Sequence, residues 1–360
     1  MSKRISAALV VAAALVTLVV PASAMARTVD AWAGSPGKAP SGTPKSAELN
    51  LFFPATLRIH AGDSVRFRNN EFHTATFLGK GAKAAALFTP DPTGATYSGI
   101  NDAQGNPFYF DGKTKFIYNL AAFGPAGSTT IGDGKTHSSG AYGKPLGRAS
   151  VTFRFPKAGS YTVVCLVHPG MRGKVIASSK GKKVPNAADV KAAVARESGR
   201  GYASAKAASQ RKPPANTVYA GIGDKATLLA FLPAKVTVKV GSSVDFIERS
   251  SSEVHNMVFG PKDYVEKFGN DTDFLPQGPG KPNQVTPVDI YGTDPPGAGG
   301  AWTYDGANHG NGFFVTPVID KQPGGPLANS SRITFTKAGT FHYFCAIHGP
   351  EMAGDVIVTQ

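Results

Sequence analysis

The chain has few of the residues that crosslink, charge or anchor a protein. It holds two cysteines and two tryptophans in 360 residues, and charged residues make up only 17%. Two cysteines permit at most one disulfide within the chain, which excludes a disulfide-rich scaffold. Acidic residues are in deficit, 24 against 38 basic ones, so the formal net charge is +14.

Long hydrophobic runs are also scarce. The run AALVVAAALVTLVV follows Lys3 and Arg4 and precedes Ala22-Ser23-Ala24. A basic start, an apolar middle and a small-residue end are typical of a secretory signal peptide. A membrane anchor is the alternative, but the run is short for a span and no stop-transfer pattern follows. We therefore expect residues 1–24 to be a signal peptide and the protein to be secreted or periplasmic, with no membrane span.

The positive charge is concentrated in one stretch. Residues 178–212 hold nine Lys or Arg against two acidic residues, a net of +7. This stretch predicts attraction to an acidic redox partner, and a solvated basic linker is the alternative. It lacks interleaved aromatic residues, so nucleic-acid binding is not expected.

The sequence repeats itself with a period of about 180 residues. NLFFPATLRIHAGDSVRF (50–67) matches LAFLPAKVTVKVGSSVDF (229–246), and RTVDAWAG (27–34) matches NTVYAGIG (216–223). Apolar and polar residues alternate in these segments, and turns rich in glycine separate them, which is typical of half-buried strands. The repeat predicts an all-β fold of two tandem antiparallel sandwiches.

The repeat also sets the expected domain bounds, 27–177 and 216–360. Between them, the Ala/Lys-rich residues 178–215 are expected to be a basic, partly helical linker. Asn186 could cap a helix that starts at Ala187, and Gly199-Arg200-Gly201 would end or interrupt it.

The two cysteines lie in matching motifs near the end of each repeat. VVCLVHPGMRGKV contains Cys165, His168 and Met171. A thiolate, an imidazole and a thioether within so short a run are ligands for a soft metal. The second motif is YFCAIHGPEMAGDV, with Cys345, His348 and Met352.

Each motif has a candidate fourth ligand far upstream, His73 or His255. Six of the eight histidines form pairs in register between the repeats: 73 with 255, 137 with 309, and 168 with 348. One thiolate, two imidazoles and a weak axial thioether form the ligand set of a type 1 blue copper centre. The sequence therefore predicts two mononuclear copper sites.

These motifs resemble those of the cupredoxins, the family of plastocyanin and amicyanin. The first loop, Cys165-x2-His168-x2-Met171, is similar to the amicyanin type. The second, Cys345-x2-His348-x3-Met352, is one residue longer and closer to plastocyanin. The resemblance implies Greek-key sandwiches in which an upstream histidine joins the Cys, His and Met of the loop.

Other interpretations of these residues remain open. A Cys165–Cys345 disulfide is possible in an exported protein, although it would not require the matching His and Met. Zinc could occupy a Cys/His2 set, and Met257 offers a competing thioether, although it is more typical of a core residue. Polar groups of Asn69 and Asn70, or of Ser250 to Ser252, are expected near the sulfurs.

The segment between the upstream histidine and the cysteine is long in both halves. The expected insertions, about 80–148 and 261–330, contain DGKTHSSG and DGANHGNG, with His137 and His309. We interpret both histidines as polar residues of a repeated turn, with a second metal site or a lid as the alternative.

An enzyme is the rival function class. Copper oxidases built from cupredoxin repeats gather ligands from His-x-His motifs, and none occurs here. We therefore predict a one-electron carrier, with electrons entering through a solvent-near imidazole of His168 or His348. The alternatives are a copper-binding, storage or delivery protein without obligate electron transfer, and a chain with one redox-active half whose other half mediates interactions.

Overall fold

The computed structural model describes residues 26–261, 284–321 and 327–360. The predicted signal peptide, residues 1–24, lies outside these ranges. Among the residues described, no helix is both long and apolar enough to cross a membrane.

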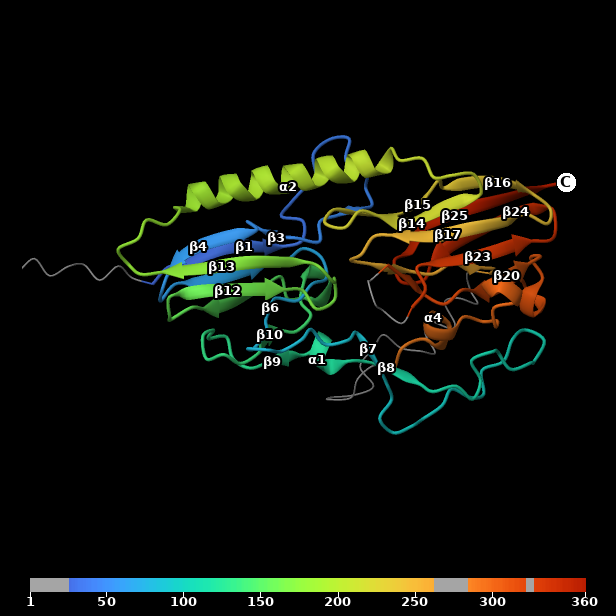
Figure 1. Ribbon diagram of the computed structural model, residues 1–360, viewed down its shortest axis with the longest axis horizontal. Helices are drawn as coiled ribbons and strands as arrows, with labels where there is room; N and C mark the ends of the chain where they lie inside the picture. The colour runs from blue at the N-terminus through green and yellow to red at the C-terminus, as the bar shows by residue number, and fades with distance from the viewer. Residues whose placement is uncertain (1–25, 262–283, 322–326) are drawn as a thin grey trace, which may run out of the picture.

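The first half of the chain forms two sheets that pack face to face (Figure 1). The four-stranded sheet has the order β11-β5-β1-β3, and the six-stranded sheet has the order β4-β13-β12-β6-β10-β9. Their bounds are β1 Thr28–Ala33, β3 Phe52–Phe53, β4 Thr56–His60, β5 Ser64–Arg68, β6 Thr76–Phe77, β9 Pro125–Ala126, β10 His137–Ser139, β11 Ser150–Arg154, β12 Gly159–Val164 and β13 Arg172–Ser178.

The second half repeats this arrangement. One sheet has the order β2-β15-β14-β17-β23-β20 and the other β16-β25-β24-β19-β21. Their bounds are β2 Ala47–Glu48, β14 Thr217–Ile222, β15 Thr227–Leu232, β16 Lys235–Lys239, β17 Ser243–Arg249, β19 Val258–Phe259, β20 Ala301–Tyr304, β21 Phe314–Val315, β23 Ser330–Phe335, β24 Gly339–Cys345 and β25 Gly349–Thr359.

Short elements complete the fold. Two strand pairs lie outside the main sheets, β7 (Phe88–Pro90) with β8 (Phe116–Tyr118), and β18 (Val254–His255) with β22 (Ile319–Asp320). The α-helices are α1 Leu120–Phe123, α2 Ala187–Ser209 and α4 Pro287–Tyr291, and the 3-10 helices are Lys144–Leu146, Ala298–Gly300 and Asn308–Gly310.

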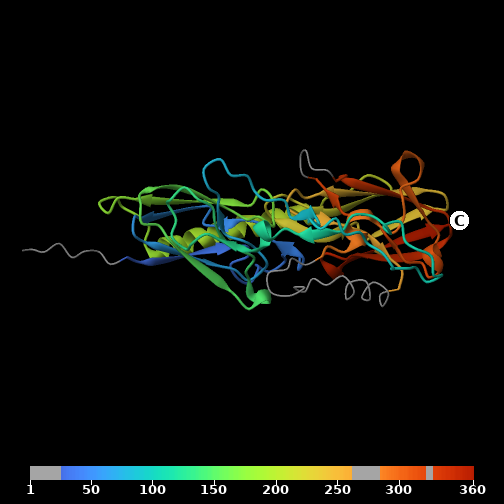
Figure 2. The same ribbon diagram turned by 90° about the horizontal axis from the view of Figure 1, so that it is seen from below.

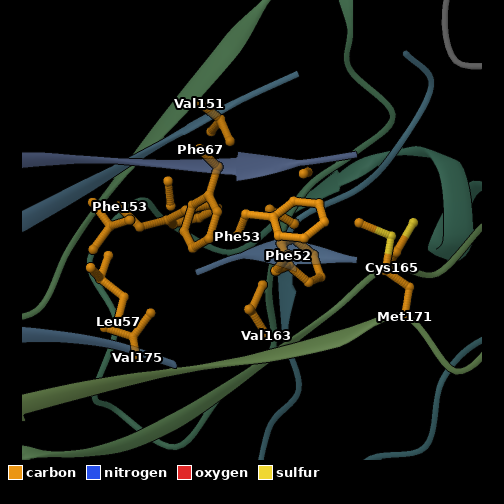
Figure 3. Close-up of a cluster of buried hydrophobic side chains, with 14 of the residues drawn as sticks. Phe52, Phe53, Leu57, Phe67, Val151, Phe153, Val163, Cys165, Met171 and Val175 are labelled. Carbon is orange, nitrogen blue, oxygen red and sulfur yellow. The ribbon is translucent and has the colours of Figure 1, made fainter. Parts of the chain in front are cut away.

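The predicted alternation is confirmed in the matched segments. Leu57 and Ile59 on β4, and Val65 and Phe67 on β5, are all buried and enter one core, part of which Figure 3 shows. β4 and β5 belong to different sheets, and Gly62, with a positive φ of 99°, lies in the turn that joins them. The sheets are mixed, because β1 pairs in parallel with β5 and β4 with β13.

The repeat register differs from the sequence match at its first segment. Ala31 pairs with Phe67 and Val218 pairs with Phe246, so the equivalent of Gly34 is Gly221. The sequence match was therefore two residues out from its first residues, because it followed residue identity rather than strand pairing.

Helix α2 lies along both halves of the molecule (Figures 1 and 2). The predicted start is confirmed. The side chain of Asn186 accepts a hydrogen bond from the Asp189 backbone N–H, and the Asp189 side chain accepts one from the Asn186 backbone N–H, which forms a capping box. Val190 and Tyr202 pack into the first core, and Ala208 packs with Ile222 of the second half. The residues expected to be a linker therefore pack against both sandwiches.

The expected helix end at Gly199-Arg200-Gly201 is wrong, because α2 continues to Ser209. Gly201 faces the first sandwich, where an added Cβ would lie 2.8 Å from Leu49 Cδ2. The missing side chain lets the helix approach Leu49, and this packing outweighs the low helix propensity of glycine.

The two halves also exchange segments. Strand β2, from the first half, is the edge strand of a sheet of the second half, with Glu48 paired to Thr227. The first insertion reaches the second sandwich, where Tyr97, Phe108 and Phe110 join one hydrophobic cluster with residues such as Phe313.

Substitution of the two helix glycines tests this account of α2. Gly199→Ala should raise the free energy of unfolding by about 0.5 to 1 kcal/mol, because nothing lies within 4 Å of the added Cβ. Gly201→Ala should give no such gain, since its Cβ must displace Leu49. Urea denaturation of both variants measures the difference, and equal gains would contradict the close helix packing.

Candidate metal centres

Three residues that the sequence singled out meet at one end of the first sandwich. His73, Cys165 and His168 are all buried, and their ligand atoms lie within 4.8 Å of one another. The Sγ atom of Cys165 lies 3.9 Å from Nδ1 of His73 and 3.5 Å from Nδ1 of His168. In both imidazole rings, Nδ1 is therefore the nitrogen that faces the sulfur.

A short loop positions two of these groups. Cys165 directly follows β12, and its backbone N–H donates to the carbonyl of Met171, whose own N–H donates to His168. Met171 is buried, and Figure 3 shows it beside Cys165 at one end of the core cluster. The loop thus brings thiol, imidazole and thioether together.

Thr74 ties the upstream strand segment to this loop. Its backbone N–H lies 3.3 Å from Sγ of Cys165, and its hydroxyl accepts from the N–H of Leu166 at 2.7 Å. The prediction that Asn69 or Asn70 lies near the sulfur is wrong, because Asn69 donates to the Tyr142 carbonyl and Asn70 to the Ser35 carbonyl. The position directly after the upstream histidine is the sequence signal for the residue that contacts the sulfur.

The second half repeats the cluster with His255, Cys345 and His348. Sγ of Cys345 lies 3.8 Å from Nδ1 of His255 and 3.6 Å from Nδ1 of His348. Met352, on β25, is buried in the same core. Met257, the competing thioether, also packs there.

Asn256 takes the place of Thr74 in this half. Its Oδ1 accepts from the N–H of Ala346 at 2.9 Å, and its Nδ2 donates to buried Asp289 at 2.8 Å. Ser250 and Ser252, expected near the sulfur, instead bond to each other and to Thr227. In both halves the residue after the upstream histidine fixes the ligand loop.

The environment favours ionised sulfur at both positions. Burial raises the pKa of each thiol, but the two neighbouring histidines outweigh burial and hold the pKa of Cys165 and of Cys345 well below its usual range. Both cysteines are free and each lies in its own cluster, so the alternative of a disulfide between them is not realised.

A carboxylate faces the outer nitrogen of each clustered histidine. Nε2 of His73 lies 3.1 Å from Glu71, and Nε2 of His255 lies 3.5 Å from Glu248, longer than a well-formed hydrogen bond. Gly34 and Gly221 leave room for these pairs, because an added Cβ at either would lie 2.3 Å from the imidazole Nε2.

The two carboxyls differ in ionisation. Burial raises the pKa of Glu71, but hydrogen bonds from His73 and Ser35 outweigh it and lower the pKa. Glu248 is fully buried, and although the Ser250 backbone N–H donates to it at 2.6 Å, burial outweighs this bond and raises its pKa well above the usual range. The surroundings of Glu71 therefore favour the anionic form of the carboxyl, and those of Glu248 favour the neutral form.

The remaining two histidines share a single carboxylate. Glu253 lies between the halves, with Oε1 3.4 Å from Nε2 of His168 and Oε2 3.3 Å from Nε2 of His348. Burial raises the pKa of Glu253, but the two histidines outweigh burial and lower it to about 2. The two clusters thus face each other across one buried anion.

This arrangement corrects the expected electron entry points. The ring of His168 is buried against Glu253 of the other half and is not solvent-near, because the sequence gave no sign that the two clusters meet. Its loop neighbours Leu166 and Val167 are buried as well. In the second loop Ile347 is 37% exposed, and His348 is only partly covered.

The other in-register pair, His137 and His309, lies outside both clusters. His137 bonds to Asp133 of its own turn at 2.7 Å and to Ser128, as a structural turn residue does. His309 has Asp102 of the first insertion at 3.2 Å on one side and Asp294 at 3.0 Å on the other. His309 therefore joins the two halves.

A pH-dependent contribution to stability follows for His309. Burial lowers its pKa, but Asp294 and Asp102 outweigh burial and raise it. A raised folded-state pKa stabilises the fold below the unfolded pKa of about 6.5, and this stability is lost as pH rises through the folded pKa.

His309→Asn removes this contribution while suiting the positive φ of 57° at this position. Thermal unfolding of both metal-free proteins across pH should show the largest loss in Tm below about pH 6.5 and a shrinking loss above it. A loss that does not change with pH would contradict the ion pairing.

The donor groups of both clusters fit a soft metal ion. Each cluster offers a thiolate and two Nδ1 atoms within 4.8 Å, and a carboxyl group lies near the outer nitrogen of each histidine, as is common for metal-ligating histidines. Sulfur and imidazole together, with a buried methionine beside them, favour copper over hard cations. These are two candidate copper sites.

Comparison with known proteins gives structural neighbours only. No family model and no curated protein matches the sequence. Among solved structures, a purple cupredoxin from Nitrosopumilus maritimus is 16% identical, with a TM-score of 0.22 over 41% of this chain and 100% of its own. Auracyanin A from Chloroflexus aurantiacus is 19% identical (TM-score 0.24, 40% and 96%), and an amicyanin variant with Cu(I) is 18% identical (0.21, 42% and 89%).

The expected all-β fold of tandem sandwiches is confirmed by the sheets of the chain itself. Both repeats end in the same strand-loop-strand unit, and in both this unit meets an upstream histidine. The chain therefore resembles two cupredoxins in tandem, each a β-sandwich with a buried histidine–cysteine–histidine group at one end.

Proposed function

We propose that the chain is a type 1 copper protein with two mononuclear sites that acts as a one-electron carrier. The observation that supports this most directly is the duplicated His–Cys–His group with its buried methionine. His73, Cys165, His168 and Met171 would hold one ion, and His255, Cys345, His348 and Met352 the other. Residues 27–177 and 216–360 are the proposed domains, joined by residues 178–215.

Copper in such a site supplies reversible one-electron chemistry, with thiolate and thioether favouring Cu(I). The protein residues hold the donors rigidly. Thr74 and Asn256 hydrogen-bond to the ligand loops and hold them in place. Both cysteines are buried, so water is kept from their sulfur atoms. Little reorganisation is then needed when the charge of the site changes.

We further propose that the protein works outside the cytoplasm and exchanges electrons with an acidic partner. The run at 7–20 supports export, and the basic residues around α2 support attraction to negative charge. Copper binding or delivery without electron transfer is the alternative. An enzyme with a trinuclear copper cluster has no support, because His137 and His309 each pair with aspartates.

Copper loading tests the proposal. The protein loaded with Cu(II) should bind two ions per chain and show an intense visible thiolate band with narrow-hyperfine EPR signals. Reversible voltammetry would distinguish a carrier from a copper store. A colourless protein that binds Cu(I) or Zn(II) tightly would contradict it.

Matched variants of the two cysteines show how much of the visible thiolate band comes from each site. Cys165→Ser and Cys345→Ser should each remove about half of the visible band, since each thiolate serves one ion. Complete loss in either variant would show that only one half binds copper in this way.

The two carboxyls behind the upstream histidines provide a test of potentials. Glu71→Gln should raise the reduction potential of the first site, because an anion near the metal stabilises Cu(II). A unit charge at ~4 Å is worth about 4 kcal/mol at an effective dielectric near 20, and the effect falls with distance. Glu248→Gln is the matched comparison and should shift the second potential less, because burial raises the pKa of that carboxyl and favours its neutral form. Redox titration measures both, and equal shifts would contradict the assigned charges.

A further inference from the structure

Glu253 occupies a special place among the carboxyls of the metal centres. Glu71 and Glu248 each face one histidine of their own half. Glu253 instead faces His168 of the first half and His348 of the second, and its side chain is only 7% exposed. It therefore lies directly between the two candidate copper sites.

The outer nitrogens of both rings are oriented toward this carboxylate. In each ring Nδ1 faces the cysteine sulfur, which leaves Nε2 to carry the proton when Nδ1 binds a metal. Nε2 of His348 hydrogen-bonds to Oε2 of Glu253 at 3.3 Å, whereas Nε2 of His168 lies 3.4 Å from Oε1 as an ion pair, longer than a well-formed hydrogen bond. The result is a continuous path of imidazole, carboxylate and imidazole.

Residues of both halves hold the carboxylate in this position. Asn50, from the first half, donates through Nδ2 to Oε1 of Glu253 at 2.6 Å and also contacts Ser252 and Thr227. Asn50 is 1% exposed, and strand β2 next to it pairs with the second half. The contacts of Glu253 are therefore buried inside the interface between the two halves and are not surface contacts.

We propose that Glu253 couples the two copper centres, so that the chain passes an electron internally from one site to the other. This rests on the proposed function, because it needs copper in both halves. The exchange is balanced: one centre goes from Cu(I) to Cu(II) while the other goes from Cu(II) to Cu(I). No proton moves, because both Nε2–H bonds and the carboxylate remain as they are.

The two ligand loops differ in exposure, which makes the second centre the outer one and the first centre the inner one in this pathway. The second loop is open to solvent at Ile347, whereas the first is covered at Leu166 and Val167. Electrons from outside therefore reach His348 first and His168 by way of Glu253. On the other side of His168, Pro169 is partly buried and Gly170 is exposed, so the first centre is covered mainly at Leu166 and Val167.

Glu253→Gln breaks this bridge with little change in size. An amide has one accepting oxygen, which would stay with Asn50 and His168, and its nitrogen would then face the Nε2–H of His348, donor against donor. Glu197→Gln is the control, because Glu197 accepts a hydrogen bond from the Ala55 backbone N–H and belongs to neither metal cluster.

The test uses the full chain loaded with copper. Pulse radiolysis that delivers less than one electron per chain should show reduction of one site, followed by redistribution at a rate independent of protein concentration. Glu253→Gln should slow the redistribution about tenfold or more, as loss of a ligand's hydrogen-bond partner does for metal-site activity. Glu197→Gln should leave the rate unchanged.

A second measurement does not depend on electron transfer. In the Cu(I) protein, NMR should show hydrogen-bonded Nε2–H protons for both His168 and His348. Glu253→Gln should shift or remove at least one of them, and Glu197→Gln should leave both.

The outcomes separate the two proposals. Failure to observe two type 1 signals in the loaded protein would overturn the proposed function and the coupling together. Two normal type 1 signals with a redistribution rate unaffected by Glu253→Gln would overturn the coupling alone. A rate that scales with protein concentration would also overturn it, because exchange would then occur between molecules.

Discussion

The structure depends on one buried anion, the carboxylate of Glu253 between the two halves. A carboxylate removed from water is costly unless cations or hydrogen-bond donors surround it. Asn50 from the first half and His348 from the second hydrogen-bond to it, and His168 from the first half forms an ion pair with it. The charge is therefore compensated only when both sandwiches are in place, which makes their relative position a condition of stability.

Three further contacts hold the halves in that position. Helix α2 packs on both cores, strand β2 completes a sheet of the second half, and the first insertion carries Tyr97, Phe108 and Phe110 onto it. Each is a segment that a minimal sandwich would not need. The extra length of the chain between its metal motifs thus serves the interface.

Much of this could be predicted from the sequence, but not the interface. Alternating residues such as Leu57 and Ile59 indicate strands, and the matched motifs name the residues that meet in each cluster, because both signals are local or repeated. Contacts between the repeats leave no such signal. Glu253 and Asn50 are 203 residues apart and have no periodic pattern. Gly201 was predicted to end or interrupt the helix because its partner Leu49 is also remote in the sequence.

Strand β2 has a consequence for how the duplicated chain can be divided. Ala47 and Glu48 precede most of the first sandwich, yet they pair with Thr227 and Leu228 of the second. A cut in residues 178–215 would leave two fragments that share a sheet, and deletion of the first copy would expose an unpaired strand edge on the second. Because they share this sheet, the two copies are not interchangeable modules but parts of a single folding unit.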